Sequence, residues 1–191
     1  MGTRGAWGFY RDGETKATYN HYDSYPSGLG SDIVNVLAET NNDELNEIFD
    51  RLKLVNSEST PTNEQIDECI KFFNGSVSTG QTTEWYALLR EAQGSLQALK
   101  DGLDYMIDDK NFLRDSLFCE WGYIVNLDSN KLEVYRGFQK VADKNRYYHP
   151  SVDQEDYKNC RLIVEIPLEQ CKIFKNDSEV FEEYVYTYAG D

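Results

Sequence analysis

The sequence is poor in the residues from which metal and redox sites are built. Its 191 residues include only four cysteines and two histidines. The cysteines form no C-x-x-C pair and no zinc-binding spacing. We therefore predict no metal and no cofactor. A chain of this length buries a sizeable core without cross-links, so reduced, partly buried thiols in a cytoplasmic protein are expected at Cys69, Cys119, Cys160 and Cys171.

Long apolar runs are absent as well. The run LIV at 162–164 is among the longest, and it is far too short to cross a membrane. The first residues do not have the pattern of a signal peptide. We therefore expect no membrane association.

Basic residues are scarce relative to acidic ones. Lysine and arginine number 19 against 34 aspartates and glutamates, which gives a net charge of -15. That charge repels a nucleic-acid backbone, so direct nucleic-acid binding is not expected. The acids are spread along the chain, which favours a role in solubility. The alternative is an acidic interaction or inhibitor protein that blocks a basic partner. A homo-oligomer is compatible with the 14 tyrosines, but the sequence does not decide it.

The first thirty residues, in contrast, are rich in unusual chemistry. Aromatic-rich runs at 3–10 and 15–23 flank Asp12-Gly13, a strong signal for a hairpin over 3–23. Its register pairs Tyr10 with Thr15, Gly8 with Ala17, Ala6 with Tyr19 and Arg4 with His21. Arg4, Tyr19, His21 and Asp23 then share one face, and Thr3, Trp7 and Tyr22 are among the residues on the other.

The rest of the chain shows helical spacing followed by strand alternation. Residues 31–110 are mainly helical, with helices expected from Ser31, over 43–54, after Thr62 and from Thr83 onward. A second hairpin at 118–138 should pair Leu127 with Leu132, and 160–166 reads as a core strand ended by Pro167. The 139–159 loop is long enough to be functional. The segment 174–191 fits a helix or an edge strand.

These elements predict one α+β domain over residues 1–191. An antiparallel sheet would be built from the N-terminal hairpin, the C-terminal hairpin and the core strand, and helices from the middle of the chain would cover it.

Several segments resemble a family of uncharacterised proteins from bacteriophages, bacteria and some fungi. They are MGTRG at the start, YNHYDSYPSGLG at 19–30, WYALLRE at 85–91 and FCEWGYIVNLDSNKLEVYRGF at 118–138. Members of that family begin with MGTRG and carry a similar YN-H-x-DSYP-x-GLG element. The resemblance implies a phage or bacterial setting and supplies no activity.

The shared hairpin face is the predicted ligand site, because small residues at 6, 8 and 17 would leave space above the sheet. Arg4 would bind charge, His21 and Asp23 would form hydrogen bonds, and Tyr19 and Tyr25 would stack. The glycine-rich turn that follows leads into a helix N-terminus, which favours an anion. The predicted ligand-binding residues are Arg4, Tyr19, Asn20, His21, Asp23, Tyr25, Gly28, Gly30 and Ser31.

Other interpretations of these residues stay open. In a structural one, Arg4 and Asp23 form an ion pair, His21 bonds a backbone carbonyl, and a helix packs on the small residues. In an enzymatic one, His21 and Asp23 act as general acid and base, or Thr3 becomes an N-terminal nucleophile once the residues before it are removed. His21, Asp23 and Thr3 are thus the catalytic candidates.

A second set of residues lies in the long loop before the core strand. It could form a lid over a phosphate-bearing ligand, or a solvated loop whose tyrosines pack on the sheet; its members are Lys144, Arg146, Tyr147, Tyr148 and His149. The leading hypothesis is a cytoplasmic accessory protein that binds or sequesters a small anionic or nucleotide-like molecule at the N-terminal hairpin.

Overall fold

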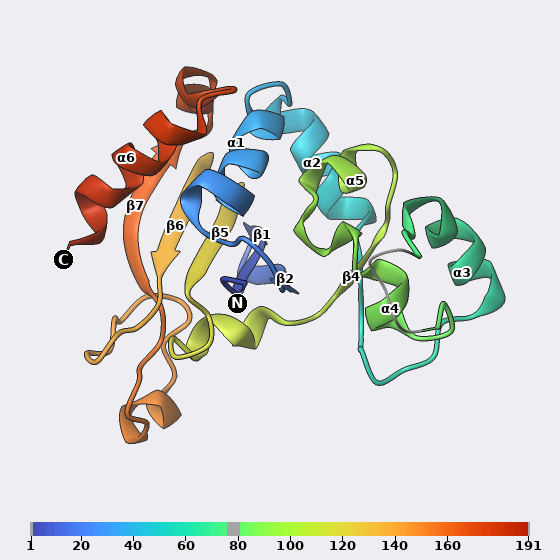
Figure 1. Cartoon of the computed structure of the whole chain (residues 1–191), viewed down its shortest axis with the longest axis horizontal. Helices are drawn as coiled ribbons and strands as arrows, with labels where there is room; N and C mark the ends of the chain where they lie inside the picture. The colour runs from blue at the N-terminus through green and yellow to red at the C-terminus, as the bar shows by residue number, and fades with distance from the viewer. Residues whose placement is uncertain (1, 76–80, 191) are drawn as a thin grey trace.

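Five strands form one twisted sheet, and the longer helices lie on one side of it (Figure 1). The computed structural model describes residues 2–75 and 81–190. The strand order is β2–β1–β5–β6–β7. The bounds are β1 Gly5–Arg11, β2 Glu14–Asn20, β5 Trp121–Asn126, β6 Lys131–Arg136 and β7 Arg161–Pro167. The fold class is α+β, as predicted.

The N-terminal hairpin has the predicted register. Residues 12 and 13 both have positive φ angles, 50° and 81°, and this backbone suits the twist of a two-residue hairpin turn. The predicted pairs within the two strands are all observed. Pairing ends where Gly5 meets Asn20, so the strands are shorter than predicted and the Arg4–His21 pair lies beyond the ladder.

The sheet is mixed, which corrects the prediction of a wholly antiparallel one. β1 pairs with β5 in parallel, with Gly5 opposite Trp121, whereas the other neighbours are antiparallel. Parallel neighbours need a long crossover, and residues 21–120 provide it. Because β1 lies inside the sheet, both its faces are covered: Ala6, Trp7 and Phe9 are at most 1% exposed.

The second hairpin is displaced by two residues from its predicted register. Leu132 pairs with Val125 and not with Leu127. The side-chain oxygen of Asn126 accepts the backbone N–H groups of the second and third residues after it, at 3.0 and 3.1 Å. This side-chain turn closes the hairpin earlier than the alternation predicts. A shift of two residues keeps every side chain on its original face.

Helices cover one face of the sheet and complete the main core. Trp7, Tyr123 and Val134 point to this face and contact apolar side chains of the helices. Phe49 of α2 meets Phe9 edge-on, with ring centroids 6.4 Å apart. The elements on this side are η1 Pro26–Gly30, α1 Ser31–Leu37, α2 Asn42–Arg51, η6 Leu168–Phe174 and α6 Ser178–Ala189. The segment 174–191, for which the sequence predicted either a helix or an edge strand, is therefore helical over α6.

The opposite face has a smaller core without long helices. The short turn η4 Lys110–Arg114 places Leu113 against Ala6 and Ala17, and Tyr147 from the long loop joins the same cluster. The loop itself contains one further turn, η5 Pro150–Gln154.

A buried carboxylate holds this long loop on the sheet. Glu133 of β6 is 1% exposed and accepts hydrogen bonds from Asn126 and Tyr135, each at 2.7 Å. Arg146 of the loop pairs with both Glu133 oxygens, and its guanidinium lies 3.8 Å from the Tyr10 ring centroid. The loop is thus tied to the sheet by one charged contact in a nearly dry environment.

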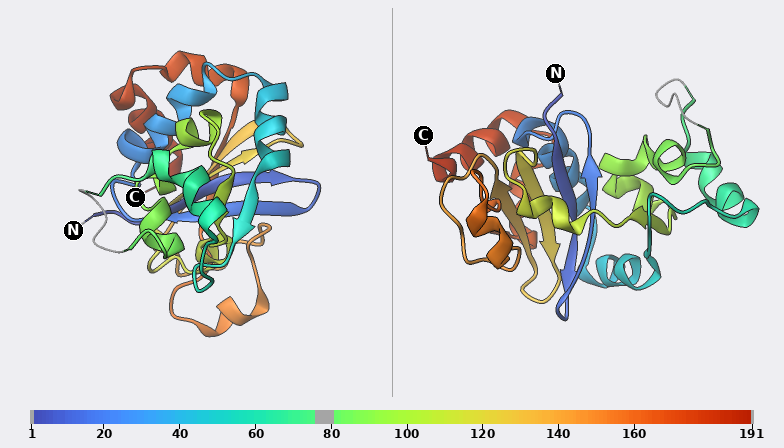
Figure 2. Two further views of the ribbon diagram at one scale, coloured as in Figure 1. Left: turned by 90° about the vertical axis from the view of Figure 1, so that its right-hand side faces the viewer. Right: turned by 90° about the horizontal axis from the view of Figure 1, so that it is seen from below.

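Between α2 and η4 the described chain has short helices joined by irregular segments and lies beside the sheet (Figure 2). Two short strands, β3 Lys53–Val55 and β4 Tyr105–Ile107, pair in parallel there. The helix predicted over 43–54 therefore ends at Arg51, and Met106 is in a strand. The helical elements are α3 Asn63–Cys69, η2 Ile70–Phe72, α4 Trp85–Leu89, η3 Ala92–Gly94 and α5 Leu96–Lys100.

Within residues 2–75 and 81–190, we find no helix with the length and apolar character needed to span a membrane.

Replacing Arg146 by Met should destabilise the protein, because Glu133 would stay buried without its cation. We expect a loss of about 3 kcal/mol in the free energy of unfolding, measured by urea denaturation. Lys144→Met is the matched control, since the Lys144 side chain is 68% exposed, and it should cost less than about 0.5 kcal/mol. Equal stability of the two variants would contradict the structural role of Arg146.

Asp109 should make stability fall with rising pH. Its carboxylate accepts the Tyr19 N–H at 3.1 Å, and burial raises the pKa of Asp109 above its ordinary 3.8. Folding then favours the protonated acid, so stability decreases as pH rises from 3.8 through the raised value. In Asp109→Asn the amide oxygen still accepts this N–H. The free energy of unfolding of the variant, measured by urea titration, should therefore rise relative to that of the wild type between about pH 3 and about pH 7. A difference between the two proteins that does not change with pH would refute this prediction.

Candidate functional site

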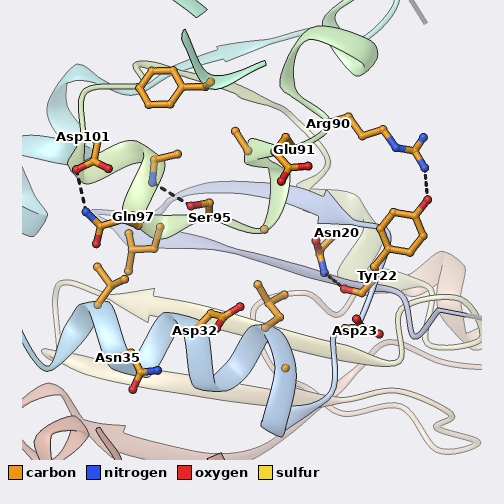
Figure 3. Close-up of a pocket in the computed structure, with 18 of the residues that line it drawn as sticks. Asn20, Tyr22, Asp23, Asp32, Asn35, Arg90, Glu91, Ser95, Gln97 and Asp101 are labelled. Atoms are coloured by element: carbon orange, nitrogen blue, oxygen red, sulfur yellow. Dashed lines mark hydrogen bonds between the residues drawn. The ribbon is translucent and has the colours of Figure 1, made fainter. Parts of the chain in front are cut away.

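A cleft of about 860 Å³ opens beside the end of the N-terminal hairpin. One wall is formed by η1 and α1, and the other by η3, α5 and the residues before them (Figure 3). Its polar lining comes from Asn20, Tyr22, Asp23, Tyr25, Ser27, Asp32, Asn35, Arg90, Glu91, Ser95, Gln97 and Asp101.

The chain reaches this cleft through a tightly built turn after β2. The side-chain amide of Asn20 donates to the Ser24 hydroxyl at 2.8 Å and to the Tyr22 carbonyl at 2.5 Å. Asp23 has a left-handed backbone, with φ of 49°. Gly28 passes so close to the Asp23 carbonyl oxygen that a Cβ atom there would collide with it. These contacts fix the turn along the rim of the cleft.

The glycine-rich turn does not provide the anion site that we predicted. The N–H groups of Gly28 and Gly30 donate to the Tyr25 carbonyl at 3.0 and 3.4 Å, and the N–H of Ser31 also donates to carbonyl oxygens within η1. Because α1 continues directly from η1, these donors are already used inside the turn. Gly30 instead serves close packing, since a Cβ there would press on the Tyr123 ring.

Arg90 lies at one end of the cleft between two phenol groups. It donates to the Tyr22 hydroxyl at 2.5 Å and to the Tyr86 hydroxyl at 3.0 Å. The hydrogen bond with Tyr22 raises the pKa of Arg90, so the guanidinium keeps its charge. Its Nε is buried without an acceptor, and none of the carboxylates that the structure describes forms an ion pair with it. The positive charge of Arg90 is therefore uncompensated within the described parts of the chain.

Carboxylates make up most of the remaining charge in the cleft. Asp32 of α1 and Glu91 lie on facing walls, and Asp101 lies at the end away from Arg90 (Figure 3). Asp23 is the fourth. Desolvation by neighbouring atoms raises the pKa of Asp32, although the residue remains exposed to solvent. The described lining thus has one guanidinium and four carboxylates.

The hairpin face that we expected to hold the ligand is filled. Ala6 and Ala17 are fully buried beneath Leu113 and Tyr147. A Cβ at Gly8 would collide with the β2 backbone, so this glycine is needed for strand packing. This part of the structural interpretation, packing on the small residues, is confirmed, with the helical turn η4 in place of a longer helix.

Of the polar residues of that face, Asp23 lines the cleft, whereas Arg4, Tyr19 and His21 lie outside it. The Arg4 guanidinium stacks over the Phe118 ring at 4.8 Å, and the Tyr19 hydroxyl meets Nδ1 of His21 at 2.5 Å. Among the described residues, the expected ion pair between Arg4 and Asp23 is not formed, and His21 makes no hydrogen bond to Asp23.

The surroundings of His21 keep its imidazole neutral. Burial, followed by the positive charges of Arg90 and Arg4, lowers the pKa of His21, and burial raises the pKa of Tyr19. The Tyr19 hydroxyl and Nδ1 of His21 thus share one hydrogen bond between two neutral groups.

Four of the predicted ligand-binding residues line the cleft: Asn20, Asp23, Tyr25 and Gly28. The others are not part of its lining, and neither is the catalytic candidate Thr3, whose carbonyl accepts the Ser24 N–H at 3.0 Å. Those outside are Arg4, Tyr19, His21, Gly30 and Ser31.

Sequence reasoning missed Tyr22 and Arg90. The hairpin alternation placed Tyr22 on the face away from the predicted site, and Arg90 read as part of an amphipathic helix. One signal was present: Tyr86 and Arg90 are four residues apart, a spacing that brings side chains together on a helix. Their contact with Tyr22, 68 residues away from Arg90, has no local signal.

The basic and tyrosine set of the long loop is held in place. Arg146 is bound to Glu133, and Tyr147 is 4% exposed in the smaller core. The other members contact residues of the same loop; they are Lys144, Tyr148 and His149. This geometry favours the packed loop over the lid.

The described residues include no group of three or more histidines, cysteines, aspartates or glutamates placed to hold a metal ion. All four cysteines are buried free thiols.

Comparisons with protein-family models, curated proteins and solved structures find no match for this chain. The function is therefore argued from the cleft itself.

Gly28→Ala should destabilise the turn that borders the cleft, because the new methyl group would collide with the Asp23 carbonyl. We expect a decrease in Tm of about 3–10 °C, the range for overpacking in a domain of this size. Gly75→Ala is the control, since its Cβ would meet only the Phe73 ring at 3.4 Å. If both variants melt at the wild-type temperature in a calorimetric scan, the close approach at Gly28 is not structurally important.

Proposed function

We propose that this protein binds a small anionic or nucleotide-like ligand in the cleft at the end of the N-terminal hairpin. The observation that carries the proposal is Arg90, an uncompensated guanidinium at one end of a cleft of about 860 Å³. Within the described parts of the chain, three arginines form ion pairs with carboxylates: Arg11, Arg51 and Arg146. Arg90 lines the cleft and contacts two phenol groups instead, so its charge is available to an anion there.

Two rings of the cleft lining suit the flat part of a nucleotide-like ligand. Tyr22 is 48% exposed beside the guanidinium, and Tyr25 also lines the cleft. Asn20, whose amide is bonded to its own turn, positions these rings. Arg90 thus has the charge-binding role that the sequence assigned to Arg4, and Tyr22 has the stacking role that it assigned to Tyr19.

These contacts support ligand binding without a catalytic step. The general acid and base candidates His21 and Asp23 are not joined by a hydrogen bond, and Nδ1 of His21 is bonded to the Tyr19 hydroxyl. In the phage or bacterial cytoplasm that the sequence resemblance implies, a protein of this kind would act as an accessory factor that binds or sequesters its ligand.

A thermal-shift screen of small metabolites tests this proposal. Compounds that stabilise the wild type should bind Arg90→Gln about tenfold to hundredfold more weakly, because a charged hydrogen bond is lost. Arg114→Gln is the matched control: the side chain of this exposed arginine makes no hydrogen bond or ion pair within the described chain, and it lies outside the cleft. Arg4→Ala and His21→Ala should also bind normally.

Two results would overturn the proposal. One is a screen in which no compound stabilises the wild type. The other is a set of stabilising compounds that bind Arg90→Gln as tightly as the control.

A further inference from the structure

The charges of the cleft are separated along its length. Arg90 and Tyr22 lie at one end, whereas Asp101 and Gln97 lie at the other, with Asp32 and Glu91 between them (Figure 3). A ligand that fills the cleft therefore meets one cation at one end and hydrogen-bond acceptors along the rest of its length.

The acceptor part of the cleft has free capacity. Asp32 makes no hydrogen bond or ion pair with any residue in the described chain, although burial raises its pKa. The Asp101 carboxylate accepts one hydrogen bond, from the Gln97 amide at 2.8 Å, which leaves its second oxygen available. Asn35, on the same wall as Asp32, already accepts the Asn176 N–H with its side-chain oxygen at 2.7 Å. The two carboxylates suit donors on a ligand and repel further negative charge.

Electrostatics then limits how much negative charge the ligand carries. The first anionic group gains attraction from Arg90. A second or third one, as in a diphosphate or triphosphate, would extend toward Glu91, Asp32 or Asp23 with no further cation in the described lining. These carboxylates are exposed to solvent, and within the cleft each further negative charge would lie close to one of them and be repelled, so extra charge weakens binding instead of improving it.

Building on the proposed function, we propose that the ligand carries a single negative charge, held by Arg90, and that its other end bears hydrogen-bond donors, hydroxyl or ammonium groups, facing Asp32 and Asp101. Ligands with several negative charges are excluded from the cleft by its carboxylates. A nucleoside monophosphate or a zwitterion meets this description, and a nucleoside triphosphate does not.

The charge class of the compounds found in the thermal-shift screen tests this inference separately from the proposed function. The library holds matched compounds with no charge, one negative charge, several negative charges and a positive charge. We expect stabilisation mainly by donor-bearing compounds with one negative charge, zwitterions included. If the stabilising compounds depend on Arg90 but carry several negative charges, or lack donors, the inference fails while the proposed function stands. If no compound binds, both fail.

Asp32→Asn provides the second measurement. It should improve the affinity for a multiply charged compound relative to its singly charged analogue by about tenfold. Asp12→Asn is the control for the same chemical change, since the Asp12 side chain is 89% exposed and not part of the cleft lining, and there the ratio should stay at the wild-type value. An unchanged ratio in Asp32→Asn would overturn the inference.

The same variant distinguishes the two kinds of donor. Asparagine still accepts a hydrogen bond from a hydroxyl, but it does not neutralise an ammonium group. If the affinity of a singly charged compound falls about tenfold in Asp32→Asn, the group that faces Asp32 is an ammonium. If the affinity stays within about twofold of the wild-type value, that group is a hydroxyl. In either case the singly charged compound should still bind more tightly than its multiply charged analogue in the wild type.

Discussion

The parallel pairing of β1 with β5 is the constraint on which the rest of the structure depends. It places β1 inside the sheet, with β2 at the edge, and both faces of β1 are buried. Trp7 and Phe9 enter the main core, while Ala6 lies beneath Leu113 in the smaller one. The crossover from β2 to β5 builds the walls of the cleft at the end of the hairpin.

Local sequence signals predicted the parts of the fold that depend on neighbouring residues. The Asp12-Gly13 turn determines the first hairpin register, and the Thr62 capping box marks the start of α3. The strand ended by Pro167 likewise follows from its own apolar residues. Long-range choices had no such signal. The parallel β1–β5 pair and the β3–β4 pair join residues that are far apart in sequence, and the Asn126 side chain shifts the second hairpin through a contact that alternation ignores.

The residues of the candidate site likewise divide into those that local sequence predicts and those that only the fold brings together. Asn20, Asp23, Tyr25 and Gly28 were predicted because they are close together in the chain around a turn, and they remain together in the cleft. The predicted anion donors failed because the turn uses its own N–H groups. Arg90, from the opposite wall, became recognisable only when the fold brought it to Tyr22.

The most direct test of the account is the NMR resonance of the Arg90 side-chain Nε–H group, because this group is buried without an acceptor in the described structure. It would be followed while a stabilising metabolite from the thermal-shift screen is titrated into isotopically labelled protein. The account predicts a saturating shift of the Arg90 resonance, with smaller shifts at Tyr22 and Asp32. A titration that leaves Arg90 unchanged and shifts Arg4 and Tyr19 would contradict it.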